Sequence, residues 1–344
     1  MFRNALNKIS RAPVLATLAT ALVGCALLGA AAARAESTAP KVRVAVSSDA
    51  ITLLPVHLAQ TLGYYKQEGL DVTIVPMRTA PQKALQDGVV DVALGTTLPI
   101  QAAAEGSSIQ GFLVIYSTTN NVLIVSPSAS GQIHSFADLK GRRIGVSSVN
   151  SLSEFFLDYV LKANGVDPAD VKAVAIGVGK PAVDAVERGD VDASLLLGGS
   201  INMLLGKHPD LKILGDTRTA EASQRILGPN KFPGSLLVAE ESWLKANPDA
   251  TRRFVRAVRK AMKWMGEHSA EEVRANMRED QRMPDAAADL QTIRDFQHML
   301  SPDGAIHKGS PELMYKVLAA SVEEIRKAHI DFSKAYTNEY LSGK

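Results

Sequence analysis

Apolar and polar residues follow one another in two recurring patterns along the chain. Short, mostly apolar runs bounded by Gly, Asp, Ser or Thr predict buried strands, and segments with apolar residues at i, i+3, i+4 and i+7 predict helices between them. Because strands alternate with helices, we expect parallel sheets that are covered by helices on both faces. The predicted strands are 41–46, 71–75, 91–94, 111–116, 122–125, 143–146, 171–176, 193–197, 212–214 and 235–239.

The strand at 143–146 leads into the most distinct of these helices. Ser151 and Glu154 have the S-x-x-E spacing of a capping box, in which each side chain accepts a hydrogen bond from the other residue's backbone N–H. The apolar face then runs from Leu152 to Ala163. A helix that begins directly after a strand presents free N–H groups and the positive end of its dipole, so this turn predicts a place where a small anion can bind.

Two blocks of the sequence occur twice. Residues 43–48 match 143–148, and 84–93 match 185–194, with offsets of 100 and 101 residues. This nearly constant offset predicts two similar α/β lobes, and chance similarity between strand–turn–helix units is the alternative. Asp192 has its counterpart in Asp91, which favours a structural role for these repeated carboxylates over a catalytic pair.

The first 35 residues are predicted to be an export signal. Three basic residues precede an apolar run at 14–33, and Ala33 and Ala35 form an A-x-A cleavage site. Two alternatives are a permanent membrane anchor and a lipid attached to Cys25, because the residues before this cysteine match a lipoprotein box. Since mostly small apolar residues follow Cys25, we favour cleavage after Ala35.

Composition narrows the possible function classes. Loss of residues 1–35, which carry four basic and no acidic residues, changes the formal net charge from +2 to −2, so nucleic acid is not an expected partner. Cys25 is the only cysteine, which excludes a disulfide or thiol chemistry in the mature chain. The seven histidines are scattered and no pair has metal-ligand spacing, so we expect neither a metal site nor a cofactor.

Several stretches give the chain a family resemblance, namely 55–59 with 63–72, 138–146 and 189–193. With them the chain resembles the periplasmic solute-binding proteins of nitrate-, sulfonate- and taurine-type ABC importers, a superfamily that includes thiamine-pyrimidine-synthesis-like proteins. The resemblance implies the type II periplasmic binding protein fold, in which two Rossmann-like α/β lobes are joined by two crossing strands. It also implies a division into a signal peptide at 1–35, the first part of lobe 1 at 41–123, lobe 2 at 124–236, and the completion of lobe 1 with C-terminal helices at 237–344.

The resemblance implies an exported, monomeric protein of the periplasm. It would capture a small anion such as a sulfonate, taurine or nitrate and deliver it to an ABC transporter permease in the inner membrane. The alternatives are a thiamine-pyrimidine precursor or another aromatic or carboxylate solute as the ligand, coupling to a sensor, and a pyrimidine-forming enzyme. We expect no enzymatic activity and no catalytic residues, because related pyrimidine-forming enzymes use cysteine-rich motifs that have no counterpart here.

The predicted site lies in loops, because ligands of open parallel sheets bind beyond the carboxyl ends of the strands. These loops are rich in Ser, Thr, Asn and Gly, and hydroxyl and N–H donors suit a small anion. Asp49 would pair with the ammonium of an aminosulfonate or cap a turn. Arg218 would contact the ligand, or it would lie at the surface or between the lobes. The serines of 147–151 would contact the ligand or only cap the helix. The predicted ligand-binding residues are Ser47, Ser48, Asp49, Thr96, Thr97, Thr118, Ser147, Ser148, Asn150, Ser151, Gly198, Gly199 and Arg218.

Overall fold

The computed structural model describes residues 39–46, 51–77 and 80–342. Outside these ranges lie the predicted export signal with Cys25, and the candidate site residues Ser47, Ser48 and Asp49. The chain divides into two compact units, 1–39 and 40–344, and everything below concerns the second unit. Among the described residues, no helix combines the length and the apolar character that a membrane span requires.

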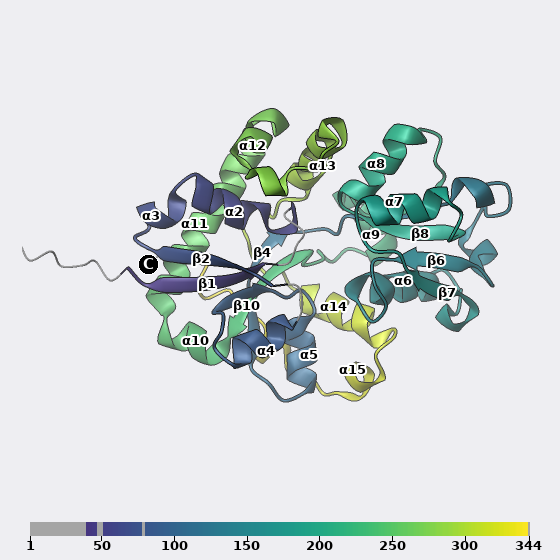
Figure 1. The fold of residues 1–344 in the computed structure, drawn as a ribbon. Helices are drawn as coiled ribbons and strands as arrows, with labels where there is room; N and C mark the ends of the chain where they lie inside the picture. The colour runs from purple at the N-terminus through teal and green to yellow at the C-terminus, as the bar shows by residue number, and fades with distance from the viewer. Residues whose placement is uncertain (1–38, 47–50, 78–79, 343–344) are drawn as a thin grey trace, which may run out of the picture. The chain divides into compact units, whose positions relative to one another are not determined.

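Two sheets form the centre of this unit, as Figure 1 shows. Each sheet has five strands. The first sheet has the order β2-β1-β3-β10-β4, and the second has the order β7-β6-β8-β5-β9. The strands of the first sheet are β1 (Lys41–Val46), β2 (Asp71–Pro76), β3 (Val92–Leu94), β4 (Ile109–Tyr116) and β10 (Ser235–Glu240). Those of the second sheet are β5 (Asn121–Val125), β6 (Arg143–Val146), β7 (Lys172–Ala175), β8 (Ala193–Leu197) and β9 (Ile213–Asp216).

Both sheets have the same strand arrangement. β1 is parallel to β2 and β3, and β6 is parallel to β7 and β8. In each sheet one strand runs antiparallel to both neighbours: β10 lies between β3 and β4, and β5 lies between β8 and β9. The predicted α/β class with two sheets and two crossings is confirmed. The expectation of purely parallel sheets is wrong at β5 and β10, because each enters its sheet directly after a crossing from the other sheet.

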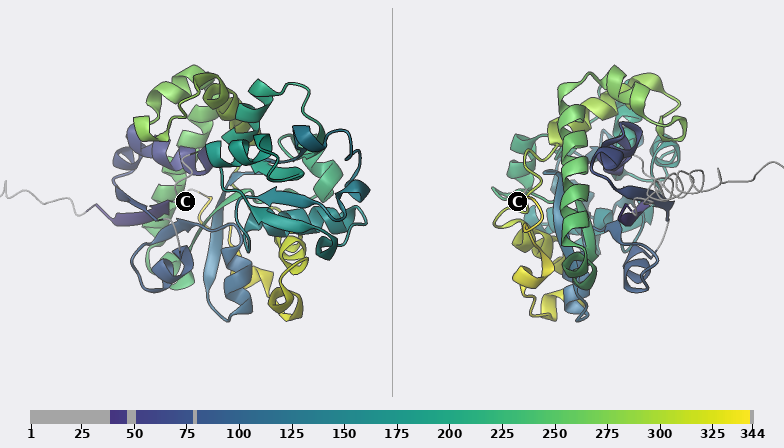
Figure 2. Two further views of the ribbon diagram at one scale, coloured as in Figure 1. Left: turned by 45° about the vertical axis from the view of Figure 1, so that its right-hand side comes forward. Right: turned by 90° about the vertical axis from the view of Figure 1, so that its left-hand side faces the viewer.

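Helices cover both faces of the first sheet. Val42 and Val44 of β1 are fully buried on the face that carries α2 and α11, whereas Ala45 faces the cluster that includes α4 and α5. This alternation is the period of two expected for a strand between two helical layers. Figure 2 shows the long helix α11, which lies against α2 and α3. The helices are η2 (Ile51–Leu53), α2 (Leu54–Thr61), α3 (Tyr64–Gln67), α4 (Pro81–Gln86), α5 (Leu98–Ala104), α10 (Glu241–Ala246) and α11 (Pro248–Glu267).

The second sheet is also covered on both faces. Val183 of α7 and Ile201 of α8 pack on Val122 and Leu196, and α6 packs on the opposite face. The helical segments here are η3 (Pro127–Ala129), η4 (Phe136–Leu139), α6 (Leu152–Ala163), η5 (Pro168–Asp170), α7 (Lys180–Glu187), α8 (Gly199–Lys207) and α9 (Ala220–Leu227). The C-terminal segments are α12 (Ala270–Asn276), η6 (Glu279–Gln281), α13 (Ala286–Met299), α14 (Ser310–Ala319), α15 (Glu323–Lys327) and α16 (Phe332–Ala335).

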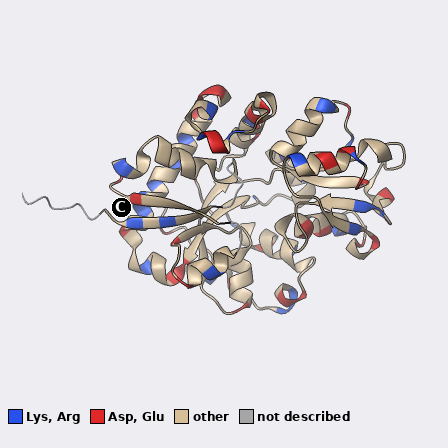
Figure 3. Ribbon diagram, viewed as in Figure 1, with Lys and Arg blue, Asp and Glu red and all other residues tan. Residues whose placement is uncertain are grey.

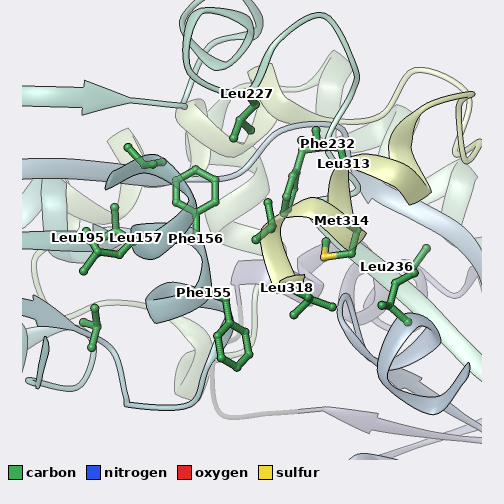
Figure 4. Packing of buried hydrophobic residues seen from close by; sticks show 14 of the residues in the cluster. Phe155, Phe156, Leu157, Leu195, Leu227, Phe232, Leu236, Leu313, Met314 and Leu318 are labelled. Atoms are coloured by element: carbon green, nitrogen blue, oxygen red, sulfur yellow. The ribbon is translucent and has the colours of Figure 1, made fainter. Parts of the chain in front are cut away.

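The C-terminal helices connect the two sheets through their cores. Leu313 and Met314 of α14 share one buried cluster with Phe155 and Phe156 of α6, as Figure 4 shows. Phe156 also makes an edge contact with Phe232, at 6.1 Å between ring centroids. On the other side of the unit, α13 lies against α8. Helices from the end of the chain therefore contact the second sheet's helices at two separate places.

An Arg–Asp pair stands at the same place in each sheet. Arg43 of β1 donates to Asp91, directly before β3, from its backbone N–H at 2.7 Å and from its guanidinium at 3.0 and 2.7 Å. Arg143 of β6 donates to Asp192, directly before β8, at 2.9 Å from the backbone and at 3.2 and 2.9 Å from the guanidinium. The matching geometry favours a structural role for these repeated carboxylates.

Candidate functional site

A cavity of about 570 Å³ opens between the carboxyl ends of strands from both sheets. Its volume lies within the range of about 300 to 1,000 Å³ that is typical of sites for organic ligands. The ends of β3 and β4 contribute Leu94 and Tyr116, and the end of β8 contributes Leu197. A segment from the C-terminal part, 277–299, supplies much of the remaining wall. In the view of Figure 3, charged residues lie mainly on the outer helices, and the strands at the centre carry few.

The structure places about half of the predicted site residues in this wall. Those that line the cavity are Thr96, Thr118, Ser147, Ser151, Gly198 and Gly199. Those that lie outside the lining are Thr97, Ser148, Asn150 and Arg218. Ser47, Ser48 and Asp49 fall outside the described residues, so their predicted role stays a prediction.

The two crossings between the sheets lie side by side at the base of the cavity. The backbone N–H of Gly234, on the return crossing, donates to Tyr116 O at 2.9 Å, and the Thr96 hydroxyl donates to Gly234 O at 3.3 Å. A Cβ atom on Gly234 would lie 1.8 Å from Thr118 O, so the close approach requires glycine. The strand ends are therefore held together at the point where a ligand would touch both sheets.

Polar atoms without a partner gather on the first crossing. Among the described residues, Thr118 Oγ1, both polar side-chain atoms of Asn120, and Asn121 Oδ1 are buried and have no hydrogen-bond partner. The three residues are only 7%, 8% and 4% exposed and all line the cavity. Because a buried polar group that lacks a partner is destabilising by about 1–3 kcal/mol, such a group in a native structure calls for a physical reason. A bound ligand is the reason that the cavity offers.

Arg282 brings a positive charge to the same cavity. Its Nη2 donates to the carbonyl oxygens of Ala275 at 3.0 Å and Met277 at 2.7 Å, whereas its Nε is buried without a partner. Within the described residues, no carboxylate lies within ion-pair distance of Arg282. The guanidinium is therefore fixed by two backbone carbonyls while its charge is left uncompensated.

The two carboxylates of the lining already have arginine partners. Asp280 accepts from Arg278 at 3.0 and 2.7 Å. Asp289, which is 2% exposed, accepts from Arg274 at 2.8 Å and from the backbone N–H of Met283 at 3.1 Å. Among the described residues of the wall, these pairs leave the cation of Arg282 as the unmatched charge. Such a cation suits an anionic group on a ligand.

Arg218, which the sequence placed among the ligand contacts, is engaged elsewhere. Its guanidinium lies 2.7 Å from Asp216 and 3.8 Å from Asp295 of α13. Burial acts to lower the pKa of Arg218, and the hydrogen bond and charge of Asp216, with Asp295, outweigh it and raise the pKa. Arg218 therefore links the end of β9 to α13 in this structure.

The serine-rich turn before α6 is internally hydrogen-bonded. The hydroxyls of Ser147 and Ser153 lie 2.7 Å apart, and Ser153 Oγ also accepts the N–H of Ser147 at 3.1 Å. The Ser151 hydroxyl donates to Ser148 O at 2.6 Å. The predicted Ser151–Glu154 capping box does not form, because Glu154 accepts the N–H of Asn150 instead, at 2.6 Å. The hydrogen bond to Glu154 thus forms one residue earlier than expected, from Asn150, which has a left-handed φ of 54°.

One wall of the cavity is apolar and aromatic. Tyr116 and Phe296 meet edge to face, with ring centroids 4.9 Å apart. The Tyr116 hydroxyl donates to Ile51 O at 3.1 Å, and burial raises the pKa of Tyr116 so that it stays a neutral donor. Met283 lies so close to Gly199 that a Cβ there would sit 2.5 Å from its sulfur. Flat rings and a flexible thioether suit the planar or apolar part of an organic ligand.

None of the residues predicted from the sequence to bind the ligand lies in the segment 277–299, which lines much of the cavity. Arg282 carries no local motif, and the segment reads as part of a helical tail. The only signal in the sequence was the break in helical spacing at Pro284, which interrupts the tail. Asn120 belongs to a loop with several polar residues, and only Thr118 was chosen from it.

Two α/β sheets joined by two crossings, with a ligand-sized cavity between their strand ends, define a periplasmic-binding-protein fold. The chain belongs to the NMT1/THI5-like family, whose model matches residues 51–272. A solved structure from Bordetella bronchiseptica RB50 has a TM-score of 0.76 and 29% identity and covers 89% of this chain and 96% of its own. The alkanesulfonate-binding protein SsuA from Xanthomonas axonopodis pv. citri, bound to MOPS, has a TM-score of 0.63 at 18% identity, over 86% of this chain and 98% of its own.

Curated relatives correct one expectation. The yeast protein named 4-amino-5-hydroxymethyl-2-methylpyrimidine phosphate synthase THI13, from Saccharomyces cerevisiae, is 27% identical over 328 residues, which is 86% of this chain and 89% of that protein. The expectation that this chain is not an enzyme is therefore contradicted, because relatives that match it over most of its length are named as synthases.

Proposed function

We propose that this protein is an exported solute-binding protein that captures a small organic anion between its two sheets. It acts as a monomer in the periplasm and passes its ligand to the permease of an ABC importer. The observation that carries the proposal is the uncompensated guanidinium of Arg282 in the wall of the cavity. The fold supports it, because solved neighbours of the same fold include a sulfonate-binding protein.

The size of the cavity favours an organic anion such as a sulfonate or carboxylate over nitrate alone. A volume of about 570 Å³ accommodates a ligand of drug-like size, and nitrate would leave most of it to water. The apolar wall around Tyr116 and Phe296 would then cover the carbon skeleton while Arg282 meets the charged group. Serine and threonine hydroxyls of the strand ends supply further donors.

A pyrimidine is the second candidate ligand. The names of the curated relatives favour it, and so does the edge-to-face pair of Tyr116 and Phe296 beside the unpartnered amide of Asn120. This candidate predicts binding without a dependence on Arg282, because a neutral ring offers no charge to the guanidinium.

A thermal-shift screen of the chain from Glu36 onward would test the proposal. The panel holds taurine, alkanesulfonates, aromatic sulfonates, nitrate, sulfate, dicarboxylates and hydroxymethylpyrimidines. A ligand at 100 times its Kd stabilises the folded state by about 2.7 kcal/mol, which is readily measured. Because relatives are named as synthases, each hit is also incubated with the protein and analysed for turnover by mass spectrometry. No shift with any organic anion, together with a clear shift for a neutral pyrimidine, would contradict the proposal.

Variants of two arginines locate the charge that binds the anion. Arg282→Gln is expected to weaken binding of an organic anion about 10- to 100-fold by calorimetry, since a hydrogen bond between charged groups contributes about 1.5–3 kcal/mol. Arg282→Lys keeps the charge and should lose less. Arg218→Gln is the matched control, because Asp216 and Asp295 already hold that guanidinium. Weaker binding in the Arg218 variant alone would assign the anion to Arg218, one of the ligand-binding residues that the sequence predicted.

A further inference from the structure

The wall of the cavity offers acceptors without partners as well as donors. Asn120 Oδ1 and Asn121 Oδ1 are acceptors, and Asn120 Nδ2 is a donor, and all three are buried and unpartnered among the described residues. Sulfate, nitrate and the sulfonate group can only accept hydrogen bonds. A ligand made only of such a group would leave both amide oxygens facing negative charge. These oxygens would be paired if the ligand also brought hydrogen-bond donors.

Asn120 is held in a fixed place between the two sheets. On one side, the hydroxyls of Thr119 and Thr217 lie 2.6 Å apart. On the other side, Asn121 O accepts the N–H of Thr217 at 3.0 Å, and Asn121 N–H donates to Thr217 Oγ1 at 3.1 Å. Because both flanking residues are anchored, the backbone cannot turn the Asn120 side chain toward another partner without breaking these bonds. The backbone that carries the amide is therefore fixed, and both polar atoms of the amide are already removed from water.

We propose that the ligand of this cavity carries a cis-amide edge in addition to its anionic group. Such an edge places an N–H beside a carbonyl, as in a lactam or a primary carboxamide, and it pairs with the two polar atoms of the Asn120 side chain in one plane. The aromatic pair of Tyr116 and Phe296 beside the crossing suits a flat group in that place. The inference depends on the proposed function in one respect only: the anionic group of the ligand, which Arg282 would hold.

An ammonium-bearing ligand and a purely structural role both account less well for the unpartnered Asn120 amide. The ammonium group of taurine would donate to the amide oxygens, but the acceptors of taurine all lie on its sulfonate, the group that Arg282 would hold, so no acceptor stands beside the ammonium for Asn120 Nδ2. A purely structural asparagine would have its own partners, as Asn202 does: its Nδ2 donates to Thr292 Oγ1 at 3.1 Å and to Asp295 at 2.8 Å. Asn202 also lines no part of the cavity wall. It is therefore the matched control for Asn120.

Calorimetry with two sets of probes tests the inference. The rigid set is benzoate, benzamide and terephthalamate, and the flexible set is propionate, propionamide and succinamate. In each set the three compounds carry the anionic group alone, the amide edge alone, or both. We expect terephthalamate or succinamate to bind at least about tenfold tighter than both of its single-group relatives, because a site with buried polar groups rejects analogues that cannot pair with them. Equal affinity for the acid with and without the amide, in both sets, would overturn the inference.

The variant Asn120→Leu separates the amide from the anion. In this variant, the compound that carries both groups should bind no more tightly than the plain acid. It should still bind more tightly than the plain amide. The variant should also raise the unfolding midpoint of the free protein or leave it unchanged, since no protein partner is lost. Asn202→Leu should lower the midpoint. A lower midpoint for Asn120→Leu with unchanged amide preference would show a structural residue and overturn the inference.

Failure of the inference and failure of the proposed function give different results. If Arg282→Gln weakens binding of every acid while Asn120→Leu changes no preference, the anion site stands and the amide edge is rejected. If Asn120→Leu removes the amide preference while Arg282→Gln changes nothing, the amide edge stands and the proposed anion binder is rejected.

Discussion

The two halves of the molecule are alike where their strands begin and differ where their strands end. Arg43 with Asp91 and Arg143 with Asp192 make the same three hydrogen bonds, at distances that agree within about 0.2 Å. At the carboxyl ends, three residues separate β3 from α5, whereas only Gly198, at a φ of +53°, separates β8 from α8. The repeat thus preserves contacts that hold the sheets, and the ligand-facing ends have diverged from one another.

The atoms that make the cavity chemically distinctive come from segments that are not repeated. Asn120 lies on the first crossing, and Arg282 lies in the C-terminal part. Neither crossing belongs to the repeated blocks of the sequence, and the segment 277–299 does not belong to them either. A two-fold scaffold therefore gains an asymmetric site from its connections and not from its sheets.

Among the changes to the crossings, substitution of Gly234 is expected to have the largest effect on stability. In Gly234→Ala the new Cβ would lie 1.8 Å from Thr118 O, a backbone atom that cannot move without shifting the first crossing. We expect a loss of about 3 kcal/mol or more of stability, at the upper end for overpacking. Urea unfolding of the chain from Glu36 onward measures it. Gly206→Ala in α8, where the new Cβ meets open space, is the control and should be neutral or stabilising. Equal midpoints for the two variants would mean that the crossings can separate freely.

His57 marks a difference between α2 and α6, the first helices of the two halves. It is 6% exposed in α2, whereas α6 buries Phe155, Phe156 and Leu157. Burial, with a smaller contribution from the charge of Arg278, lowers the pKa of His57 from 6.5 to about 4 against the opposing effect of Asp280. Above pH 6.5 the ring is neutral in both states. Between pH 6.5 and 4 only the unfolded chain takes up the proton, so the stability of the folded state falls as the pH falls.

His57→Phe gives α2 the kind of side chain that α6 has, and it should remove this pH dependence. The folded wild type should lose about 3 kcal/mol relative to the variant between pH 7 and pH 4, from the pKa difference and 1.36 kcal/mol per unit. Stability near pH 7 should change little, because the Nδ1 atom has no partner among the described residues. Thermal unfolding at a series of pH values measures both. Parallel pH profiles for the wild type and the variant would show that His57 is protonated in the folded state as readily as in the unfolded chain.

The sequence predicted the parts of this structure that depend on local pattern. The strands, the two sheets and the repeat follow from apolar spacing, which is fixed by each segment on its own. The site depends on the path of the whole chain. Arg218 follows a strand end, as the rule for such sites requires, but Asp216 and Asp295 hold its charge. Arg282 carries no local motif, and it reaches the cavity because the segment 277–299, whose helix α13 contacts both α8 and α11, lines the wall. Asn120 likewise carries no local motif. The side chain lacks a partner because of the way all its neighbours are arranged, which the local sequence does not reveal.

The repeated Arg–Asp pairs offer the finest test of the comparison, because their geometry is shared and their burial is not. The Asp91 side chain is 7% exposed and that of Asp192 is 20% exposed. Asp91→Ala leaves Arg43 and a backbone N–H without an acceptor in the drier place, so we expect it to reduce stability by about 2 kcal/mol, and Asp192→Ala by about 1 kcal/mol. Asp190→Ala is the control: its partner Arg188 is largely exposed, and the loss should stay below about 0.5 kcal/mol.

The hydrogen bonds of Arg143 lower the pKa of Asp192 despite partial burial, so part of its contribution to stability should disappear as the pH falls through that lowered value. Urea unfolding of the three variants ranks them. Equal losses for Asp91 and Asp192 would mean that shared geometry decides the energy of these pairs, and the predicted order would mean that burial does.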